Sequence, residues 1–332
     1  MSGLVGVRIA GTGRYTPEQK LTNADLSKIV DTSDEWIVQR TGIHERRICD
    51  PAKGEQTRTI SQWALERALK DSGTDPAELE LVILASVTGE MRCPATACVI
   101  ASAVGAVNAG AFDILAACSG FVYAMQLAHD LIACGSYKTV GVIGCDTMSK
   151  LLDFDNRGVC VLFGDAAGAA ILKATDDTSK GKRVGAMRSD GSGWKDLYIP
   201  EIDSDYPEGA SRETNKIDTL QMNGREVYKF AVGTFPRLIA ETLERGNVTV
   251  EDVDMFICHQ SNARMIESAR EKFGIPHEKM YVNIDRYGNC SAGSVPLCLD
   301  ELREQGKCQE GDLVMFVAFG GGLTWASLLW QM

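Results

Sequence analysis

Two kinds of segment alternate along the chain. Continuous apolar runs rich in aliphatic residues and bounded by turn residues predict strands buried on both faces. They cover 79–87, 138–146, 253–261 and 312–322. Apolar residues at helical spacing between them predict helices. These cover 59–72, 120–134, 234–245 and 261–273. Alternating buried strands and helices are typical of an α/β protein.

The pattern also contains an internal repeat. ISQWALERALKDSGTDPAELELVILASV at 60–87 and FPRLIAETLERGNVTVEDVDMFICHQS at 235–261 both combine a helix, a turn, an acidic stretch and a buried strand. Such self-similarity predicts two similarly built halves packed together. We place them at 1–173 and 174–332. The stretch 174–219 is polar and rich in turn residues, which predicts a connection and a surface excursion.

Composition and charge exclude several classes of protein. The chain has 332 residues, 45% of them hydrophobic, and a net charge of −11, which argues against nucleic-acid binding. No apolar run reaches the roughly 18 residues of a membrane span, and the first residues do not resemble a signal peptide, so we expect a cytoplasmic protein without membrane attachment. The 11 cysteines are scattered and never form C-x-x-C, so we expect neither a metal site nor a disulfide framework.

Cys118 lies between the predicted strand of AFDILAA, 111–117, and the helix over 120–134. A helix N-terminus favours a thiolate and can lower a cysteine pKa from about 8.5 into the range of roughly 3.5–7.5. Position alone leaves a second interpretation open, a small buried residue at a tight helix start.

A nucleophilic cysteine needs a partner, and the chain has four histidines. His129 falls in the middle of a predicted helix and is expected on its surface, while His44 and His277 lie in charged, loop-like stretches and are expected in solvent. His259 ends a buried strand, at the sheet edge where α/β proteins place ligands. The alternative for His259 is a structural histidine.

Two further motifs carry candidate groups. Asn289, in YGNCSAGSVP at 287–296, has small neighbours that allow its amide to approach another group closely, although a turn asparagine would look the same. FGGGLTW at 319–325 follows a buried strand, and its glycines allow a backbone N–H to point at developing negative charge.

Taken together, these motifs resemble those of β-ketoacyl-acyl-carrier-protein synthase III, a thiolase-superfamily condensing enzyme. The resemblance extends over essentially the whole chain. The matching stretches are VDTSDEWIVQRTGIHERRI (30–48), FDILAACSGF (112–121), NRGVCVLFGDAAGAAIL (156–172), HQSNARMI (259–266), YGNCSAGSVP and FGGGLTW. The resemblance implies the duplicated five-layer αβαβα thiolase fold and a homodimer.

It also implies a reaction. Cys118, His259 and Asn289 would form a Cys-His-Asn triad, and the backbone N–H groups of Cys118 and Gly322 an oxyanion hole. The implied activity is decarboxylative Claisen condensation of an acyl-CoA primer with malonyl-acyl carrier protein (malonyl-ACP), which initiates fatty acid synthesis. CoA thioester is a substrate there, and no cofactor is expected.

Binding positions follow from the same resemblance. Trp36 and Arg157 would sandwich the adenine of CoA, and the other implied CoA contacts are Thr32, Arg40, Gly224 and Asn262. The alternative for Trp36 is a core tryptophan, which its polar setting in SDEWIVQR disfavours. The basic face for the carrier protein would consist of Arg264, Lys229 and Arg225, for which ordinary solvated charges are the alternative.

Two cysteines depart from the family pattern. Cys93 stands where acetyl-selective relatives commonly have a phenylalanine that reaches across the dimer to limit the acyl pocket, so we predict a deeper pocket that admits primers longer than acetyl. Cys290 follows Asn289 where many relatives have threonine or another small residue, and we interpret it as a packing variant, with a second catalytic thiol as the alternative.

Three other functions remain open. The same triad serves secondary-metabolite condensing or acyl-transferring enzymes with a different acceptor. A hydrolase would release free acid from acylated Cys118 without malonyl substrate. A non-catalytic binding protein of this fold is disfavoured by the intact set of Cys118, His259 and Asn289.

Overall fold

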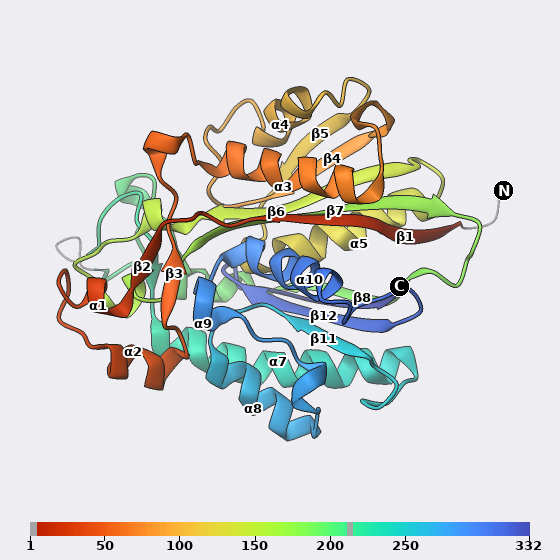
Figure 1. Cartoon of the computed structure of the whole chain (residues 1–332). Helices are drawn as coiled ribbons and strands as arrows, with labels where there is room; N and C mark the ends of the chain where they lie inside the picture. Colours follow the sequence, from red (N-terminus) through yellow and green to blue (C-terminus); the bar gives the residue numbers. More distant parts are fainter. Residues whose placement is uncertain (1–4, 211–214) are drawn as a thin grey trace.

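The computed structural model describes residues 5–210 and 215–332, which form two stacked β-sheets (Figure 1). The first sheet has the strand order β1-β7-β6-β4-β5. Its strands are β1 (Gly6–Tyr15), β4 (Leu81–Ala85), β5 (Gly110–Ile114), β6 (Thr139–Thr147) and β7 (Asp165–Thr175). The strands β4, β5 and β6 run parallel, while β7 is antiparallel to both β6 and β1.

The second sheet has the order β11-β12-β13-β8. Its strands are β8 (Gly181–Ser189), β11 (Met255–Cys258), β12 (Leu313–Gly320) and β13 (Thr324–Gln331). The pair β11 and β12 is parallel, and β12-β13-β8 is antiparallel. The first sheet therefore has three parallel strands and the second has two.

Helices complete a five-layer stack. The outer face of the first sheet is covered by α3 (Thr57–Ser72) and α4 (Thr96–Val104), and that of the second by α7 (Gly224–Gly246) and α8 (Ala263–Phe273). Between the sheets lie α5 (Gly120–Ala133) and α10 (Ser294–Glu304). The αβαβα architecture expected from the family resemblance is confirmed.

The predicted strands of both sheets are buried. Every residue of β4, β6, β11 and β12 is buried, as their continuous apolar runs predict. All strands of the first sheet fall within 6–175 and all of the second within 181–331. One core cluster nevertheless joins the halves, because Phe121 of α5, Val295 of α10 and Phe316 of β12 belong to it.

Three expectations need correction. Within the stretch expected to be a polar connection, residues 181–189 form β8, which pairs with β13. The helix expected at 234–245 begins ten residues earlier, at Gly224. His129 lies 8% exposed against Trp330, not on the helix surface, because α5 is sandwiched between the sheets.

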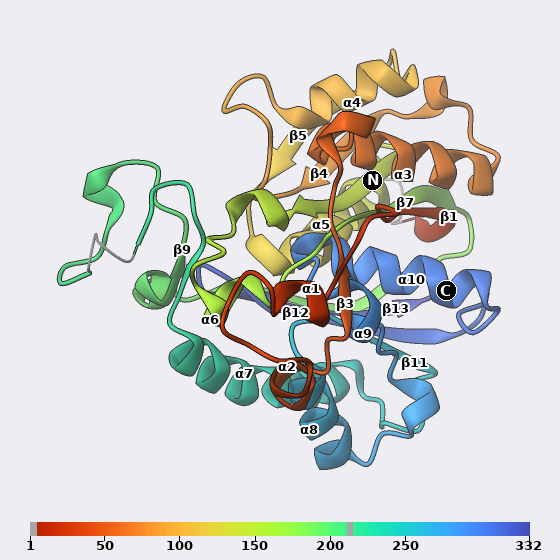
Figure 2. The same ribbon diagram turned by 60° about the vertical axis from the view of Figure 1, so that its left-hand side comes forward.

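Shorter elements gather at one end of the stack. They are α1 (Asn23–Leu26), α2 (Asp34–Thr41), α6 (Arg157–Cys160), α9 (Ile284–Tyr287), and the strand pairs β2 (Lys20–Thr22) with β3 (Glu45–Arg47) and β9 (Leu197–Tyr198) with β10 (Gln221–Met222). Figure 2 shows α2 beside α8 and part of the chain between β8 and α7 extending away from the stack.

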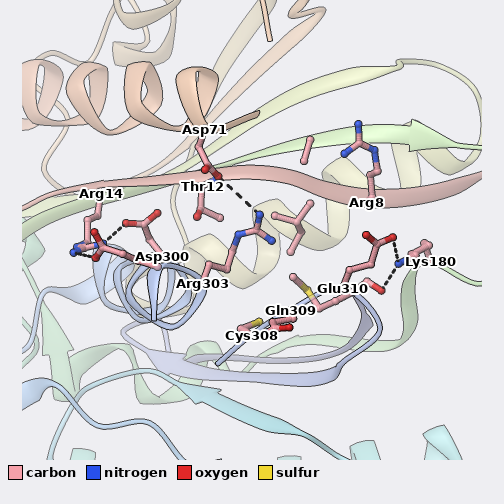
Figure 3. Close-up of a pocket in the computed structure, with 14 residues that line it drawn as sticks. Arg8, Thr12, Arg14, Asp71, Lys180, Asp300, Arg303, Cys308, Gln309 and Glu310 are labelled. Atoms are coloured by element: carbon pink, nitrogen blue, oxygen red, sulfur yellow. Dashed lines mark hydrogen bonds and ion pairs between the residues drawn. The ribbon is translucent and has the colours of Figure 1, made fainter. Parts of the chain in front are cut away.

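A polar cleft of about 720 Å³ lies between β1 and α10, away from these shorter elements (Figure 3). Arg14 of β1 pairs with Asp300 and Glu304 of α10, each at 2.5 Å. Arg303 of α10 pairs with Asp71 of α3 at 3.8 Å. The guanidinium groups labelled Arg14 and Arg303 are thus engaged in ion pairs that join the two halves.

Candidate active site

A second cavity, of about 760 Å³, opens where carboxyl ends of strands from both sheets meet. Cys118 follows β5, His259 follows β11 directly, and Gly322 follows β12. Asn289 reaches the same cavity from the segment between α9 and α10. The four side chains and backbone groups that the sequence singles out for chemistry therefore line one cavity.

Cys118 sits in the 3₁₀ turn Ala117–Ser119 immediately before α5, as the sequence predicts. Its Sγ donates to Ser291 Oγ at 3.4 Å. Only 8% of the residue is exposed, and burial raises the pKa of the thiol to about 12. The expectation of a lowered pKa at the helix N-terminus is wrong in direction, because removal from water penalises the thiolate.

His259 is 2% exposed, and burial lowers the pKa of its imidazole to about 3. The ring packs edge-on against Phe319, with centroids 5.6 Å apart. Its Nδ1 lies 2.8 Å from Ser294 Oγ. Ser294 Oγ also donates to Ser291 O at 2.9 Å, and its one hydrogen cannot serve both partners, so the contact with Nδ1 does not assign the imidazole hydrogen to Nε2.

Asn289 is fixed through both backbone and side chain. Its N–H donates to Leu162 O at 2.8 Å, and its carbonyl accepts from Gly164 N at 3.1 Å. Its Oδ1 accepts from Ser291 N at 2.9 Å. Because a backbone N–H can only donate, this contact assigns the amide oxygen and leaves the NH₂ end to donate elsewhere.

The backbone around Cys118 is tightly constrained. A Cβ built on Gly320 would lie 2.6 Å from Cys118 N, so only glycine lets β12 approach Cys118 so closely. Ala117 and Ser291, on either side of the thiol, have φ of 45° and 47°. Positive φ is costly for residues with a side chain and is concentrated at functional sites.

Trp36 of α2 lies with two arginines at the outer part of the cavity. Arg40 Cζ is 4.4 Å from the centroid of the indole, and Arg157 Cζ is 5.2 Å from it. Arg157 also donates to Asp31 O at 2.7 Å. Trp36 and Arg40 line the cavity, whereas Arg157 lies beside the lining residues. The indole is half-buried, packs against the core cluster that contains Ile37, and has two arginines over its ring.

The remaining CoA candidates surround the same region. Asn262, the N-cap of α8, accepts from Arg264 N at 2.9 Å, and its Nδ2 donates to Arg40 O at 2.9 Å. Gly224 begins α7 and lines the cavity with Asn262. Thr32 does not line it, but its buried Oγ1 has no hydrogen-bond partner within residues 5–210 and 215–332.

The three basic candidates are exposed at the first turns of two neighbouring helices. Arg225 and Lys229 lie on α7, and Arg264 lies on α8, close in sequence to the lining residues Gly224 and Asn262. Lys229 makes an ion pair with Glu226 at 3.6 Å.

Cys93 and Cys290, the two cysteines that depart from the family pattern, differ in their burial. Cys93 is exposed and is not among the residues that line the cavity of its own chain. Cys290 is fully buried and donates to Tyr287 O at 3.3 Å, away from the cavity.

Sequence reasoning missed the groups that hold these side chains. Ser291 contacts Cys118, and Ser294 contacts His259. Asp146, the buried residue near the end of β6, accepts hydrogen bonds from Val87 N at 2.8 Å and Ala292 N at 3.1 Å. The available signals were the two serines that follow Asn289 and an acidic residue at the end of an apolar strand.

The fold and the site together define a thiolase-like protein with a cysteine in its cavity, at the turn before α5. Models of the family "3-Oxoacyl-[acyl-carrier-protein (ACP)] synthase III" match residues 112–191, and those of its C-terminal part match 243–332. The chain is 46% identical over 325 residues to β-ketoacyl-[acyl-carrier-protein] synthase III of Caldanaerobacter subterraneus subsp. tengcongensis, covering 97% of each chain. The protein belongs to the β-ketoacyl-acyl-carrier-protein synthase III family.

Solved structures agree with this assignment. The 3-oxoacyl-[acyl-carrier-protein] synthase III of Aquifex aeolicus VF5 is 42% identical, with a TM-score of 0.90 and coverage of 98% of this chain and 100% of that one. The priming β-ketosynthase of the R1128 polyketide pathway is 32% identical, with a TM-score of 0.91 and coverage of 100% and 98%. In the described part of the chain, no helix has both the length and the apolar character that crossing a membrane requires.

Proposed function

We propose that the protein condenses an acyl-CoA primer with malonyl-ACP, releasing CO₂ and forming β-ketoacyl-ACP for fatty acid synthesis. The observation that carries this proposal is the meeting of Cys118, His259 and Asn289 in one cavity of a chain that belongs to this family. The cavity also reaches Trp36 and Arg40, whose stacked side chains suit the adenine end of CoA. CoA acts as a substrate, and no cofactor is required.

In the first half-reaction Cys118 Sγ attacks the thioester carbonyl of acyl-CoA. The carbonyl oxygen gains negative charge, which the backbone N–H groups of Cys118 and Gly322 stabilise as an oxyanion hole. One such donor typically lowers the barrier by about 3 kcal/mol. The C–S bond to CoA then breaks, leaving the acyl group on Cys118 and releasing CoA as the free thiol.

In the second half-reaction malonyl-ACP loses CO₂ and forms a thioester enolate. Two neutral donors stabilise its oxygen, His259 Nε2–H and the Asn289 NH₂. Burial keeps His259 uncharged, so its imidazole carries one hydrogen, and donation to the enolate uses that hydrogen on Nε2. The enolate carbon attacks the acyl group, and the C–S bond to Cys118 breaks to give β-ketoacyl-ACP.

For CoA, we propose that adenine stacks between Trp36 and Arg157 after the guanidinium moves off the indole. Arg40 and Thr32 then contact the adenine and phosphates, and Asn262 and Gly224 the pantetheine arm. The Thr32 hydroxyl, which is buried and has no partner in the described residues, must become accessible for such a contact. The acidic carrier protein docks on Arg264, Lys229 and Arg225, where local positive charge overcomes the net charge of −11.

We also propose a cytoplasmic homodimer in which the partner copy completes the acyl pocket. β5 is the edge strand of the first sheet, and nearby Leu115 and Val107 are 80% and 81% exposed. An exposed edge with apolar side chains favours pairing with a second copy. Cys93 would then lie at the partner's acyl pocket. Cys93→Phe should selectively reduce activity with primers longer than acetyl, and an unchanged chain-length preference would contradict this.

A second candidate is a condensing enzyme of secondary metabolism with the same triad. The similarity of the chain to a priming β-ketosynthase of a polyketide pathway favours retaining this second candidate. Consumption of malonyl-ACP with CO₂ release separates a condensing enzyme from a simple acyltransferase, and the competing efficiency of fatty acid and polyketide carrier proteins separates the two pathways. Steady release of free acid without malonyl substrate would indicate a hydrolase.

Intact-protein mass spectrometry tests the proposal directly. The protein is mixed with acetyl-, butyryl-, isobutyryl-, octanoyl- and dodecanoyl-CoA, and malonyl-ACP is then added. We expect an acyl adduct that disappears in Cys118→Ala and is consumed on adding malonyl-ACP. His259→Ala and Asn289→Ala should still form the adduct but fail to discharge it. A persistent adduct on Cys118→Ala would show that another cysteine is the nucleophile.

A further inference from the structure

The two hydrogen-bond donors that face the enolate in the proposed reaction come from different parts of the chain. His259 follows β11, and Asn289 lies 30 positions later, between α9 and α10. An enolate oxygen can accept from both groups only if their separation is held, because a displacement near 1 Å can slow a reaction about 100-fold. Contacts that join the two segments therefore determine how well the donors work.

Glu301 of α10 is a buried carboxylate, 3% exposed, at the centre of such contacts. Its Oε2 accepts from Asn283 Nδ2 at 2.8 Å and from Tyr281 OH at 3.1 Å. Its Oε1 accepts from Tyr287 OH at 2.8 Å, and Arg286 pairs with the same oxygen at 3.3 Å. One side chain thus binds four residues of a single short segment.

These donors also keep Glu301 charged. Burial alone would raise the pKa of its carboxyl group, but the hydrogen bonds from Asn283 and Tyr287 and the charge of Arg286 lower the pKa overall. Glu301 is therefore a carboxylate near pH 7. An ionised carboxylate only accepts hydrogen bonds, and its two oxygens can serve several donors at once.

Asn283 extends the contacts of Glu301 to His259. The backbone N–H of Asn283 donates to Gln260 Oε1 at 3.0 Å, and Gln260 Nε2 donates to Cys258 O at 2.9 Å. Gln260 and Asn283 are each 1% exposed. Two buried hydrogen bonds therefore lead from Glu301 to Gln260, whose side chain also binds the residue on the other side of His259.

Tyr287 extends the contacts of Glu301 to Asn289. Tyr287 ends α9, and only Gly288, with φ of 66°, separates it from Asn289. Tyr287 is 8% exposed, so loss of its hydrogen bond to Glu301 would leave a buried polar group without its partner. The position of Asn289 thus depends on a hydrogen bond two residues earlier in the chain.

Cys118 is held by other contacts. Thr324 Oγ1 donates to Ala116 O at 3.0 Å, at the start of the turn that carries Cys118. In the described part of the chain, no hydrogen bond joins Glu301 or its four partners to this turn. One hydrogen bond, from Cys118 Sγ to Ser291 Oγ, connects Cys118 to the segment of Asn289. Loss of the Glu301 contacts should therefore affect the enolate donors far more than the nucleophile.

We propose that Glu301 is a positioning residue for the decarboxylation step, because it fixes His259 and Asn289 relative to each other. Glu301 does not line the cavity, so it acts through Asn283 and Tyr287. Without its carboxylate, the two donors move apart and stabilise the enolate less, while acylation of Cys118 continues. This inference rests on the proposed function, in which His259 and Asn289 act in the second half-reaction.

Quenched-flow mass spectrometry measures the two half-reactions separately at pH 7. Acetyl- or butyryl-CoA forms the acyl adduct, and malonyl-ACP then discharges it. We expect Glu301→Ala to form the adduct near the wild-type rate but to discharge it about 100-fold more slowly, the effect of a displacement near 1 Å. Glu301→Gln should recover most of the discharge rate, because its amide can accept from Asn283 and donate to Tyr287 OH.

The split between half-reactions is a readout that general destabilisation would not give. Glu304→Ala is the matched control, since it removes a carboxylate from the same helix at a side chain that is 68% exposed, and it should change neither rate. Normal discharge in Glu301→Ala would overturn the proposal. So would an equal loss in both half-reactions, or a Glu301→Gln variant as slow as Glu301→Ala.

Tyr287→Phe keeps the proposal testable if Glu301→Ala does not fold. It removes only the hydroxyl that donates to Glu301, on the side of Asn289. We expect discharge to slow about tenfold, in keeping with the loss of one buried hydrogen bond, and adduct formation to stay near the wild-type rate. Wild-type discharge in Tyr287→Phe would overturn the proposal.

Crystal structures of the wild type and Glu301→Ala make the test independent of the proposed function. The separation of the His259 and Asn289 side chains should change by about 1 Å in the variant, while Cys118 stays in place. An unchanged separation would overturn the positioning role of Glu301. A wild-type adduct that malonyl-ACP does not discharge would instead contradict the proposed function alone.

Discussion

At the scale of single residues, burial determines the charge states of the site. It raises the pKa of Cys118 to about 12 and lowers that of His259 to about 3, so both are neutral near pH 7. The N-terminus of α5 favours a thiolate, but its contribution is typically about 0.3–1 kcal/mol, less than the cost of burying a charge. The resting site is therefore a thiol and a neutral imidazole, not an ion pair.

Acid should destabilise the folded protein through His259. An unfolded histidine titrates near 6.5, so below that pH the unfolded state binds a proton that the folded state excludes until about pH 3. The contribution of His259 to the free energy of unfolding is thus fully present above pH 6.5 and is lost as the pH falls. The loss is at most about 1.4 kcal/mol per pH unit. Thermal melts from pH 6.5 to 4.5 should show a larger decrease in Tm for the wild type than for His259→Gln. Parallel decreases would contradict the assignment.

The close approach of Gly320 to Cys118 is also testable. A methyl group at Gly320 would meet backbone 2.6 Å away and must displace the nucleophile or β12. We expect Gly320→Ala to slow acylation about 100-fold, the effect of a displacement near 1 Å. Gly233→Ala in α7, where nothing lies within 4 Å, is the control and should gain roughly 0.5–1 kcal/mol of stability. Normal acylation by Gly320→Ala would show that this contact does not position the nucleophile.

At the scale of elements, the first turns of α7 and α8 combine basic residues with the cavity rim. We expect Arg264→Glu to raise the KM for malonyl-ACP about tenfold, corresponding to about 1.4 kcal/mol, while acylation from acyl-CoA is unchanged. Lys272→Glu makes the same charge change in the last turn of α8 and should affect neither step. Steady-state kinetics at two salt concentrations check this, since salt screens the docking charges. An equal loss in both half-reactions would argue against docking.

The sequence was most informative where burial and periodicity coincide. The strands β4, β6 and β12 are fully buried apolar runs, and Cys118 and His259 follow strands whose carboxyl ends meet by topology. The start of α7 was missed because Pro236, preceded by Gly233, is typical of the first turn of a helix, although Phe230 and Ala231 continue the apolar spacing toward the N-terminus. The hydrogen bond from Ala292 N to Asp146 joins segments 146 positions apart, so no local pattern contains it.

At the scale of the whole molecule, the two halves share their middle layer. α5 comes from the first half and α10 from the second, yet each packs between both sheets. α10 contacts β1 and β7 of the first sheet, and α5 contacts β8 and β13 of the second. The sequence repeat describes how the chain is built, whereas the shared core predicts that the two halves fold as one unit.

The last prediction follows from that shared core. A fragment of residues 1–176 keeps every strand of the first sheet but loses α10, which would expose Phe121, Met125 and the inner face of the sheet to water. We expect 1–176 and 177–332 each to lack a cooperative thermal transition alone, and co-expression to restore one transition and Cys118 acylation. Circular dichroism melts and native mass spectrometry measure this. Cooperative unfolding of 1–176 alone would show that the first half is a separate domain, with the interface adding function rather than stability.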